Sequence, residues 1–211
     1  MKNETIKNLK VYKKALIVVD MVNGFVREGA LADPHIAITI KRQQELIEEY
    51  KKDGGLVIFI KDTHTKDSVE HDRFGGALHC IIGTKEAELI DEIKPYENTE
   101  NTISLQKNST SFVWAKNKEE GYNFINVLEG LENVEQIDIV GCCTDICVIN
   151  GVNPMMNWFD EENKRVKVYL HTDAIDTYEI PGVHDRDKYE EAAYMLMEQQ
   201  GAKKVKKLGN K

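Results

Sequence analysis

The feature that most constrains the fold is a set of short, continuous apolar runs separated by segments of helical periodicity. The clearest runs are residues 15–19, 56–60 and 137–140. They lack the polar alternation of a half-exposed strand and are short for buried helices, so each predicts a strand buried on both faces. Weaker runs at 102–106, 166–170 and 205–208 predict three more strands, the last at a sheet edge.

Helical patterns lie between these runs. Apolar residues recur at helical spacing over 36–50, 124–131 and 189–197, and a short helix is expected within 85–93. A further helix should follow Cys147 and kink or restart at Asn153-Pro154, because proline removes a backbone hydrogen bond. The alternation predicts an α/β fold of three layers, α/β/α, with a mainly parallel, Rossmann-like central sheet.

The length and composition indicate one domain and argue against nucleic acid and membrane partners. The 211 residues can form a single domain over 1–211, with residues 1–13 as a loose N-terminal extension. A net charge of −8 argues against nucleic acid as a partner. No apolar run approaches the roughly 20 residues that span a membrane. Three of the four cysteines lie within 142–147, which suits a reducing cytoplasm better than a disulfide framework.

Reactive side chains follow four of the predicted strands. They are Asp20 after the first strand, Asp62 and His64 after the second, Lys107 after the third and Cys147 after the fourth. Because ligands bind at the carboxyl ends of parallel strands, these residues should meet at one edge of the sheet.

Cys147 is a candidate nucleophile. It falls at the start of a helix that follows a buried strand, where the backbone N–H groups and the helix dipole make a thiol lose its proton more easily. Asp20 could accept that proton, with Lys107 holding the charges in place. A Cys–His pair using His171 or His184 is the rival assignment. Taken alone, this stretch favours the competing interpretation, in which Cys147 is a small buried core residue.

The turn before Cys147 suits an oxyanion site. After a strand and before a helix, backbone N–H groups can converge on a developing negative oxygen, and those of Cys143 and Cys147 are the expected donors. Thr144 and Asp145 are typical helix-start residues. A Cys143–Cys147 disulfide is the redox alternative.

A second cluster suggests a metal site. Asp62 and His64 alternate at the end of a strand and so point the same way, and a long loop could return His79 to them. Ordinary polar loop residues are the competing interpretation. Further possible ligands in this loop are Glu70, His71, Asp72 and Cys80.

Four sequence blocks carry a resemblance to a known family. They are residues 18–25 (VVDMVNGF), Asp62-Thr63-His64 with residues 79–84 (HCIIGT), residues 106–112 (QKNSTSF) and residues 141–148 (GCCTDICV). In this order they resemble the isochorismatase-like cysteine hydrolases. The Asp-x-His and His blocks favour the nicotinamidase branch of that family.

The resemblance implies a mechanism. Asp20 would take the proton of Cys147 while Lys107 orients the pair, and the thiolate would attack the carboxamide carbon of nicotinamide. Nicotinate and ammonia would form through a thioester, a step of NAD salvage. The backbone N–H groups of Cys143 and Cys147 would hold the oxyanion, beside a cis peptide between Cys142 and Cys143.

The resemblance also implies a cofactor and a pocket. A divalent metal, zinc before iron or manganese, would be held by Asp62, His64 and His79 and would bind the pyridine nitrogen. Asp72 fills the place of a further acidic ligand. Phe25 would line the ring pocket, and Phe74 is the nearest candidate for packing on the ring. The resemblance to this family also implies that the chain forms a homo-oligomer.

The sequence departs from the family pattern at four places. Gly24 stands where the family often has Asp, Cys142 and Cys143 replace the usual aliphatic residues, Phe74 is only the nearest match to the aromatic residue of the metal loop, and Asn153-Pro154 is unusual after the nucleophile. The last three departures bear on the choice of substrate more than on the chemistry. One alternative is therefore a hydrolase of another small amide or ureide with the same three catalytic residues. A non-enzyme alternative is a redox- or metal-responsive binding protein on this fold.

Overall fold

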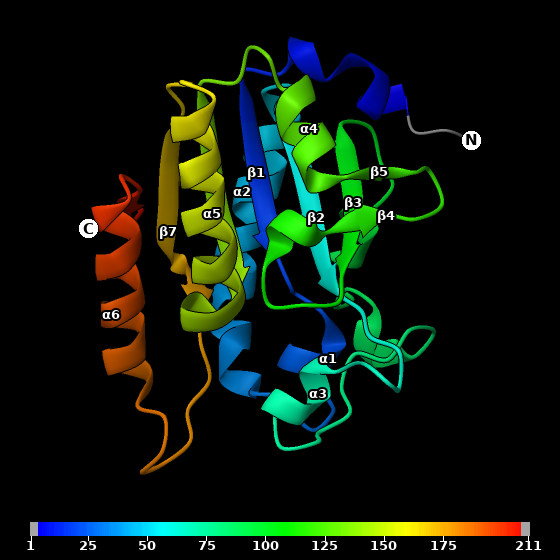
Figure 1. Cartoon of the computed structure of the whole chain (residues 1–211), viewed down its shortest axis with the longest axis vertical. Helices are drawn as coiled ribbons and strands as arrows, with labels where there is room; N and C mark the ends of the chain where they lie inside the picture. Colours follow the sequence, from blue (N-terminus) through cyan, green and yellow to red (C-terminus); the bar gives the residue numbers. More distant parts are fainter. Residues whose placement is uncertain (1–3, 208–211) are drawn as a thin grey trace.

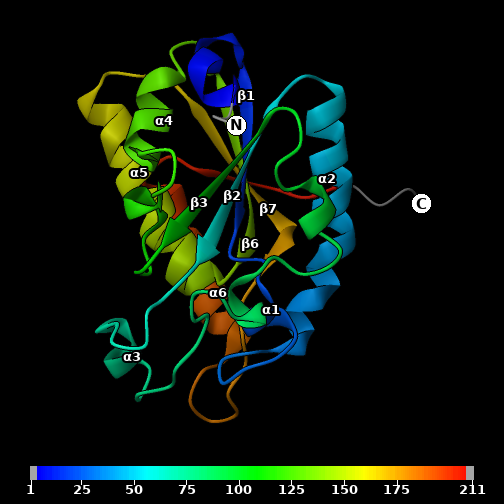
Figure 2. The ribbon, with the colours of Figure 1, turned by 90° about the vertical axis from the view of Figure 1, so that its right-hand side faces the viewer.

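The computed structural model describes residues 4–207, which form a twisted sheet covered by helices on both faces (Figures 1 and 2). In the described part, the sheet has eight strands in the order β5-β4-β3-β2-β1-β6-β7-β8. Six strands run parallel, and the short β4 and β5 pair antiparallel at one edge. The bounds are β1 Lys14–Val19, β2 Leu56–Asp62, β3 Thr102–Lys107, β4 Lys116–Asn117, β5 Tyr122–Asn123, β6 Gln136–Cys142, β7 Lys167–Asp176 and β8 Lys203–Val205.

Helices form the outer layers. Viewed edge-on, α2 lies on one face of the sheet, whereas α4 and α5 lie on the other (Figure 2). The short helices α1 and α3 lie beyond the carboxyl ends of the strands (Figure 1). The bounds are α1 Asn23–Val26, α2 Ile40–Lys52, α3 Glu70–Arg73, α4 Phe124–Gly130, α5 Ile149–Glu161 and α6 Arg186–Gln199. Within residues 4–207, no helix is long and apolar enough to cross a membrane. The predicted three-layer α/β/α fold is confirmed.

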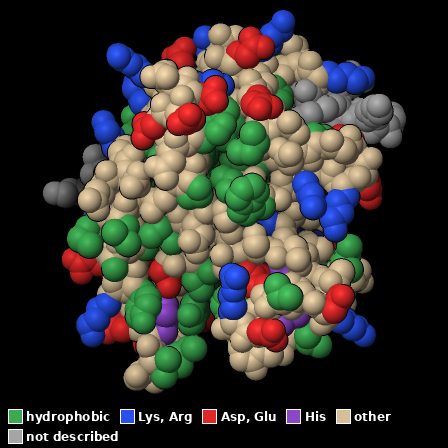
Figure 3. Space-filling view, viewed as in Figure 1, with side chains coloured by type: hydrophobic (Ala, Val, Ile, Leu, Met, Phe, Trp, Pro, Cys, Tyr) green, Lys and Arg blue, Asp and Glu red, His purple; other side chains and the backbone are tan. Residues whose placement is uncertain are grey.

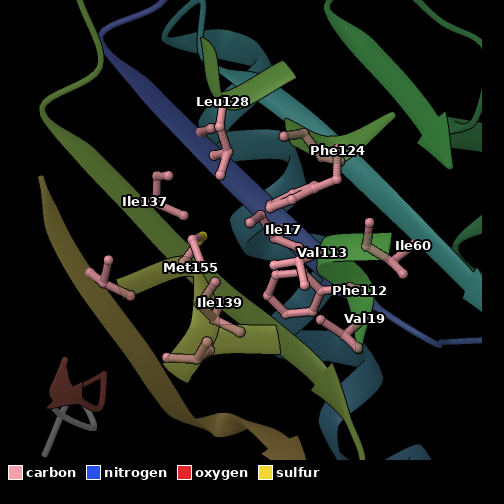
Figure 4. Packing of buried hydrophobic residues seen from close by; sticks show 14 of the residues in the cluster. Ile17, Val19, Ile60, Phe112, Val113, Phe124, Leu128, Ile137, Ile139 and Met155 are labelled. Carbon is pink, nitrogen blue, oxygen red and sulfur yellow. The ribbon is translucent and has the colours of Figure 1, made fainter. Parts of the chain in front are cut away.

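The core forms because alternate residues of each parallel strand face opposite helix layers. Ile17 and Val19 of β1 pack under α4 and α5 with Phe112, whereas Leu16 and Val18 face α2. Figure 4 shows the first of these layers, in which side chains from β1, β2 and β6 interlock with those of α4 and α5. Burial on both faces explains why these strands read as continuous apolar runs.

Several element boundaries differ from the sequence prediction. Strand β7 continues through His171 to Asp176, because polar residues beyond 170 still pair with β6 and β8. The edge strand is Lys203–Val205 rather than 205–208, and residue 208 lies outside the described part. The expected helix at 85–93 is a single 3₁₀ turn, Lys85–Ala87. Part of the expected loose extension is packed, since Leu9 and Tyr12 are buried in the core.

Pro154 lies inside α5 without ending it. A proline at this position cannot donate to the carbonyl of Asn150, one turn earlier. Instead, the Ser111 hydroxyl donates to that carbonyl over 2.6 Å. The loop after β3, which follows Lys107, is thereby attached to the helix that follows the nucleophile turn.

Candidate active site

Asp20, Lys107 and Cys147 converge at the carboxyl edge of the sheet, as the strand-end argument predicted. The Lys107 ammonium lies 2.9 Å from Asp20 Oδ2 and 3.5 Å from Cys147 Sγ. All three side chains are buried. Asp20 follows β1 with a left-handed backbone (φ 52°), and its N–H donates to the carbonyl of Ile60. The sheet therefore fixes the position of the carboxylate.

The electrostatics of this group keep the thiol protonated in the resting site and the carboxylate able to act as a base. Burial raises the pKa of Asp20 to about 6, against the opposing effect of Lys107. Burial also raises the pKa of the Cys147 thiol, with Asp20 and Asp62 acting in the same direction and Lys107 against it. The expectation that the helix start lowers this pKa is wrong, because desolvation outweighs it. A thiol with a raised pKa needs an adjacent base to lose its proton.

Cys147 lies in a π-helical turn, Thr144–Val148, that precedes α5. Such turns are rare and often occur at functional sites. The Cys142–Cys143 peptide is cis, as the family resemblance implied. The side chain of Asp145 does not cap the helix as expected. It bonds instead to Thr177 and His184, in the segment between β7 and α6.

A second cluster adjoins the first and has the composition of a cation site. Ligand atoms of Asp62, His64, Glu70 and His79 all lie within 4.8 Å of one another, and the four residues are buried. His64 Nε2 lies 2.7 Å from Asp62 Oδ2 and 2.9 Å from Glu70 Oε2. His79 Nε2 lies 3.5 Å from the same oxygen of Asp62.

The surroundings of these residues fit a divalent cation. The other ring nitrogen of each histidine has an acceptor, since His64 Nδ1 lies 2.8 Å from Asn108 Oδ1 and His79 Nδ1 2.9 Å from the Ala77 carbonyl. Metal-binding histidines usually have such partners, which fix the ring orientation. Glu70 Oε1 is buried without a hydrogen-bond partner. An orphaned carboxylate oxygen in a cluster of nitrogen and oxygen donors suits zinc, iron or manganese.

Asp62 connects the two clusters. Its Oδ1 accepts from Lys107 Nζ over 2.7 Å, and its Oδ2 faces both histidines. Burial alone would raise the pKa of Asp62, but Lys107, His64 and His79 together lower it. Burial would likewise lower the pKa of Lys107, which Asp20 and Asp62 instead raise well above its usual value. Asp62 and Lys107 are therefore both charged at neutral pH.

Both clusters open into one cavity of about 540 Å³. Cys143 and Cys147 line it together with the aromatic rings of Phe25 and Phe74. These rings lie 5.9 Å and 5.5 Å from the His79 ring, centroid to centroid. The space-filling view has the orientation of Figure 1, in which the carboxyl ends of the strands point downward. Histidine side chains reach the surface at this lower end, beside hydrophobic residues (Figure 3). The cavity thus combines a thiol, a charged network and aromatic walls.

Some predicted site residues lie elsewhere. Asp72 is exposed and is not in the cluster, where Glu70 lies in its place. His71 Nε2 faces the Thr65 carbonyl, and Cys80 is also outside the cluster. His171 pairs with Asp138 at 3.0 Å, and neither it nor His184 lines the cavity. A Cys–His pair with either of these histidines is therefore wrong.

The comparison with family models decides the classification. The model described as the isochorismatase domain matches residues 14–205. The chain belongs to the isochorismatase family. Among residues 4–207, this match includes every strand and the residues of both clusters.

Individual relatives and solved structures are also similar to this chain. Nicotinamidase 1 of Arabidopsis thaliana is 29% identical over 143 residues, which cover 65% of this chain and 57% of that protein. A pyrazinamidase of Pyrococcus horikoshii, solved in complex with zinc, is 27% identical with a TM-score of 0.69, covering 92% and 99% of the two chains. An N-carbamoylsarcosine amidase of Thermoplasma acidophilum is 23% identical with a TM-score of 0.70, covering 94% and 99%.

One departure from the isochorismatase family pattern has a packing explanation. A Cβ atom on Gly24 would lie 2.6 Å from Cys80 Sγ, so the buried sulfur leaves no room for a larger residue. Sequence reasoning missed the cavity residues Tyr178, Glu179 and Ile180. They follow the end of β7, which was placed too early in the sequence, so no signal marked them.

Proposed function

We propose that the protein is a metal-containing cysteine amidohydrolase that converts nicotinamide to nicotinate and ammonia, as a step of NAD salvage. The observation that carries the proposal is the buried Asp20–Lys107–Cys147 group opening into the same cavity as the cluster of Asp62, His64, Glu70 and His79. The likeness to a nicotinamidase and to a zinc-bound pyrazinamidase supports the substrate class.

The first step is activation of the thiol. Asp20 and Cys147 both adjoin the Lys107 ammonium, and the raised pKa of Asp20 makes it a stronger base than an exposed carboxylate. It takes the thiol proton, and the Lys107 ammonium stabilises the resulting thiolate. The Cys147 sulfur then attacks the carboxamide carbon, and a tetrahedral intermediate forms.

The next steps release both products. The backbone N–H groups of Cys143 and Cys147 stabilise the negative oxygen of the intermediate. Asp20 returns the proton to the leaving nitrogen, and ammonia departs from a thioester on Cys147. Asp20 then removes a proton from water, which attacks the thioester and releases nicotinate and the free thiol.

The metal cluster and the aromatic residues orient the ring. Asp62, His64, Glu70 and His79 would hold a divalent cation, with zinc first because of the zinc-bound pyrazinamidase neighbour. Such an ion would supply a Lewis acid for the pyridine nitrogen. Phe25 and Phe74 line the same cavity and provide apolar surface against which the ring packs.

The test is ammonia release from nicotinamide by the zinc-loaded wild type, by Cys147→Ala and by chelator-treated protein. The proposal predicts turnover by the wild type, none by Cys147→Ala, and a strong loss with chelator. No ammonia from the zinc-, iron- or manganese-loaded wild type would reject nicotinamide as substrate. Release from another small amide or a ureide in the same assay would favour that substrate class instead.

A further inference from the structure

We propose that residues 177–184 form a wall of the substrate pocket that sets affinity and ring selectivity, and that Asp145 and His184 are the positioning residues that hold it. The proposal rests on the proposed function for the identity of the substrate. The wall segment connects β7 to α6, and Tyr178, Glu179 and Ile180 within it line the cavity.

A single carboxylate joins both ends of this wall segment to the nucleophile turn. Asp145 lies two residues before Cys147, and its side chain is largely buried. Its Oδ1 accepts from the Thr177 hydroxyl over 2.5 Å, and its Oδ2 lies 2.9 Å from His184 Nε2. The first and last residues of the segment are thus fixed to the same turn that carries the thiol.

His184 transmits this attachment to Tyr178. Its ring is stacked between Tyr178 and Tyr189, with centroids 3.9 Å from each and interplanar angles of 15° and 28°. Its Nδ1 lies 3.0 Å from the Tyr178 carbonyl oxygen. Both ring nitrogens therefore face acceptors, and one side chain fixes the backbone and the ring of a cavity-lining residue.

The outer side of the wall is attached to a second cavity segment. Asp33, which lines the cavity, accepts from the Glu179 backbone N–H over 3.0 Å and from Arg186 over 2.9 Å. Arg186 Nε also donates to the Thr177 carbonyl over 2.8 Å. The wall is therefore held between the nucleophile turn and residues 30–33, although it contains exposed Gly182 and Val183.

This arrangement defines what the wall contacts. Tyr178 and Ile180 add aromatic and aliphatic surface to a cavity whose reacting groups lie on other elements. A wall of this kind binds the ring in the ground state and the transition state alike, so it affects KM and not kcat. The substrates it would select are heteroaromatic carboxamides with a small apolar ring substituent or none.

The test uses His184→Phe, which keeps an aromatic ring in the stack and removes both hydrogen bonds. Loss of these bonds should raise KM for nicotinamide about five- to tenfold while kcat stays within about twofold. The ratio of kcat/KM between nicotinamide and a ring-methylated nicotinamide should change as well. Thr177→Val removes the other bond to Asp145 and should shift KM in the same direction.

His171→Phe is the matched control, because it also removes a buried His–Asp pair, away from the cavity. Its KM and substrate ratio should equal those of the wild type. Unchanged KM in both His184→Phe and Thr177→Val, or a loss confined to kcat, would overturn the proposal.

Hydrogen exchange separates this proposal from the function on which it rests. Backbone amides of residues 178–184 should exchange faster in His184→Phe than in the wild type and His171→Phe. This measurement needs no substrate, so it tests the attachment even if nicotinamide is not turned over. Equal exchange in the two variants would show that His184 does not hold the wall.

Discussion

The thiol side and the metal side of the cavity are built in different ways. Asp20, Lys107 and Cys147 each lie at or just after the end of a parallel strand. On the metal side only Asp62 belongs to a strand, and Glu70 and His79 come from the long connection between β2 and β3. The sheet register therefore fixes the first group, whereas the path of a loop fixes most of the second.

The two sides share one carboxylate. Asp62 contacts Lys107 through one oxygen and the two histidines through the other. A change in the metal cluster should reach the thiol through Lys107, but it removes neither the nucleophile nor the base. The comparison predicts that damage to the thiol side abolishes turnover, whereas damage to the metal side reduces it.

Cys147→Ala should have the largest effect. It removes the nucleophile, so kcat/KM for the amide should fall about 10⁴-fold or more. Cys143→Ala is the matched control, since Cys143 lines the same cavity and contributes its backbone N–H rather than its sulfur. Ammonia release measures both variants. Comparable loss in both would mean that the two thiols act together and would break the assignment of a single nucleophile.

Glu70→Gln should have the next largest effect, on the metal side. It replaces a buried cluster oxygen by an amide and should lower zinc affinity about 10- to 100-fold, the scale found for changes around metal sites. Bound zinc after equilibrium dialysis measures it. Asp72→Asn is the control and should bind zinc like the wild type, because Asp72 is exposed and outside the cluster. The reverse result would restore Asp72 as a ligand.

The same contrast explains what the sequence could and could not predict. Asp20, Lys107 and Cys147 were found because apolar runs locate strand ends, and parallel strands end together. Glu70 and Asp72 differ by two positions in a connection without a periodic pattern, so spacing could not decide between them. The segment after β7 was missed because polar residues of that strand continue to pair beyond Leu170.

The pH dependence of kcat/KM should report the pKa of the carboxylate that accepts the thiol proton. Asp20 must be ionised to accept a proton, and its pKa is raised to about 6 by burial. At saturating zinc, kcat/KM should reach a plateau above that pH and fall about tenfold for each pH unit well below it. An acid limb near pH 4, where an exposed aspartate titrates, would contradict the role of burial in setting this base.

Ser111→Ala should have the smallest effect. It tests whether a contact that supports the thiol side can be removed with a loss of stability but no change in substrate binding. The Asn150 carbonyl cannot accept from Pro154, which has no N–H. The substitution also removes the Ser111 hydroxyl that donates to this carbonyl. The free energy of unfolding in urea should fall by about 1 kcal/mol, with KM unchanged. Ser109→Ala, which removes only a 3.4 Å contact, should leave stability unchanged.

The most direct test of the central claim is the site of acylation during turnover. The zinc-loaded wild type is mixed with nicotinamide and quenched in acid within milliseconds. The masses of the intact protein and of its proteolytic peptides are then measured by mass spectrometry. The account predicts a nicotinoyl group on the peptide that contains Cys147, absent from Cys147→Ala and present in Cys143→Ala. A nicotinoyl group on Cys143 or Cys80, or turnover retained by Cys147→Ala, would contradict it.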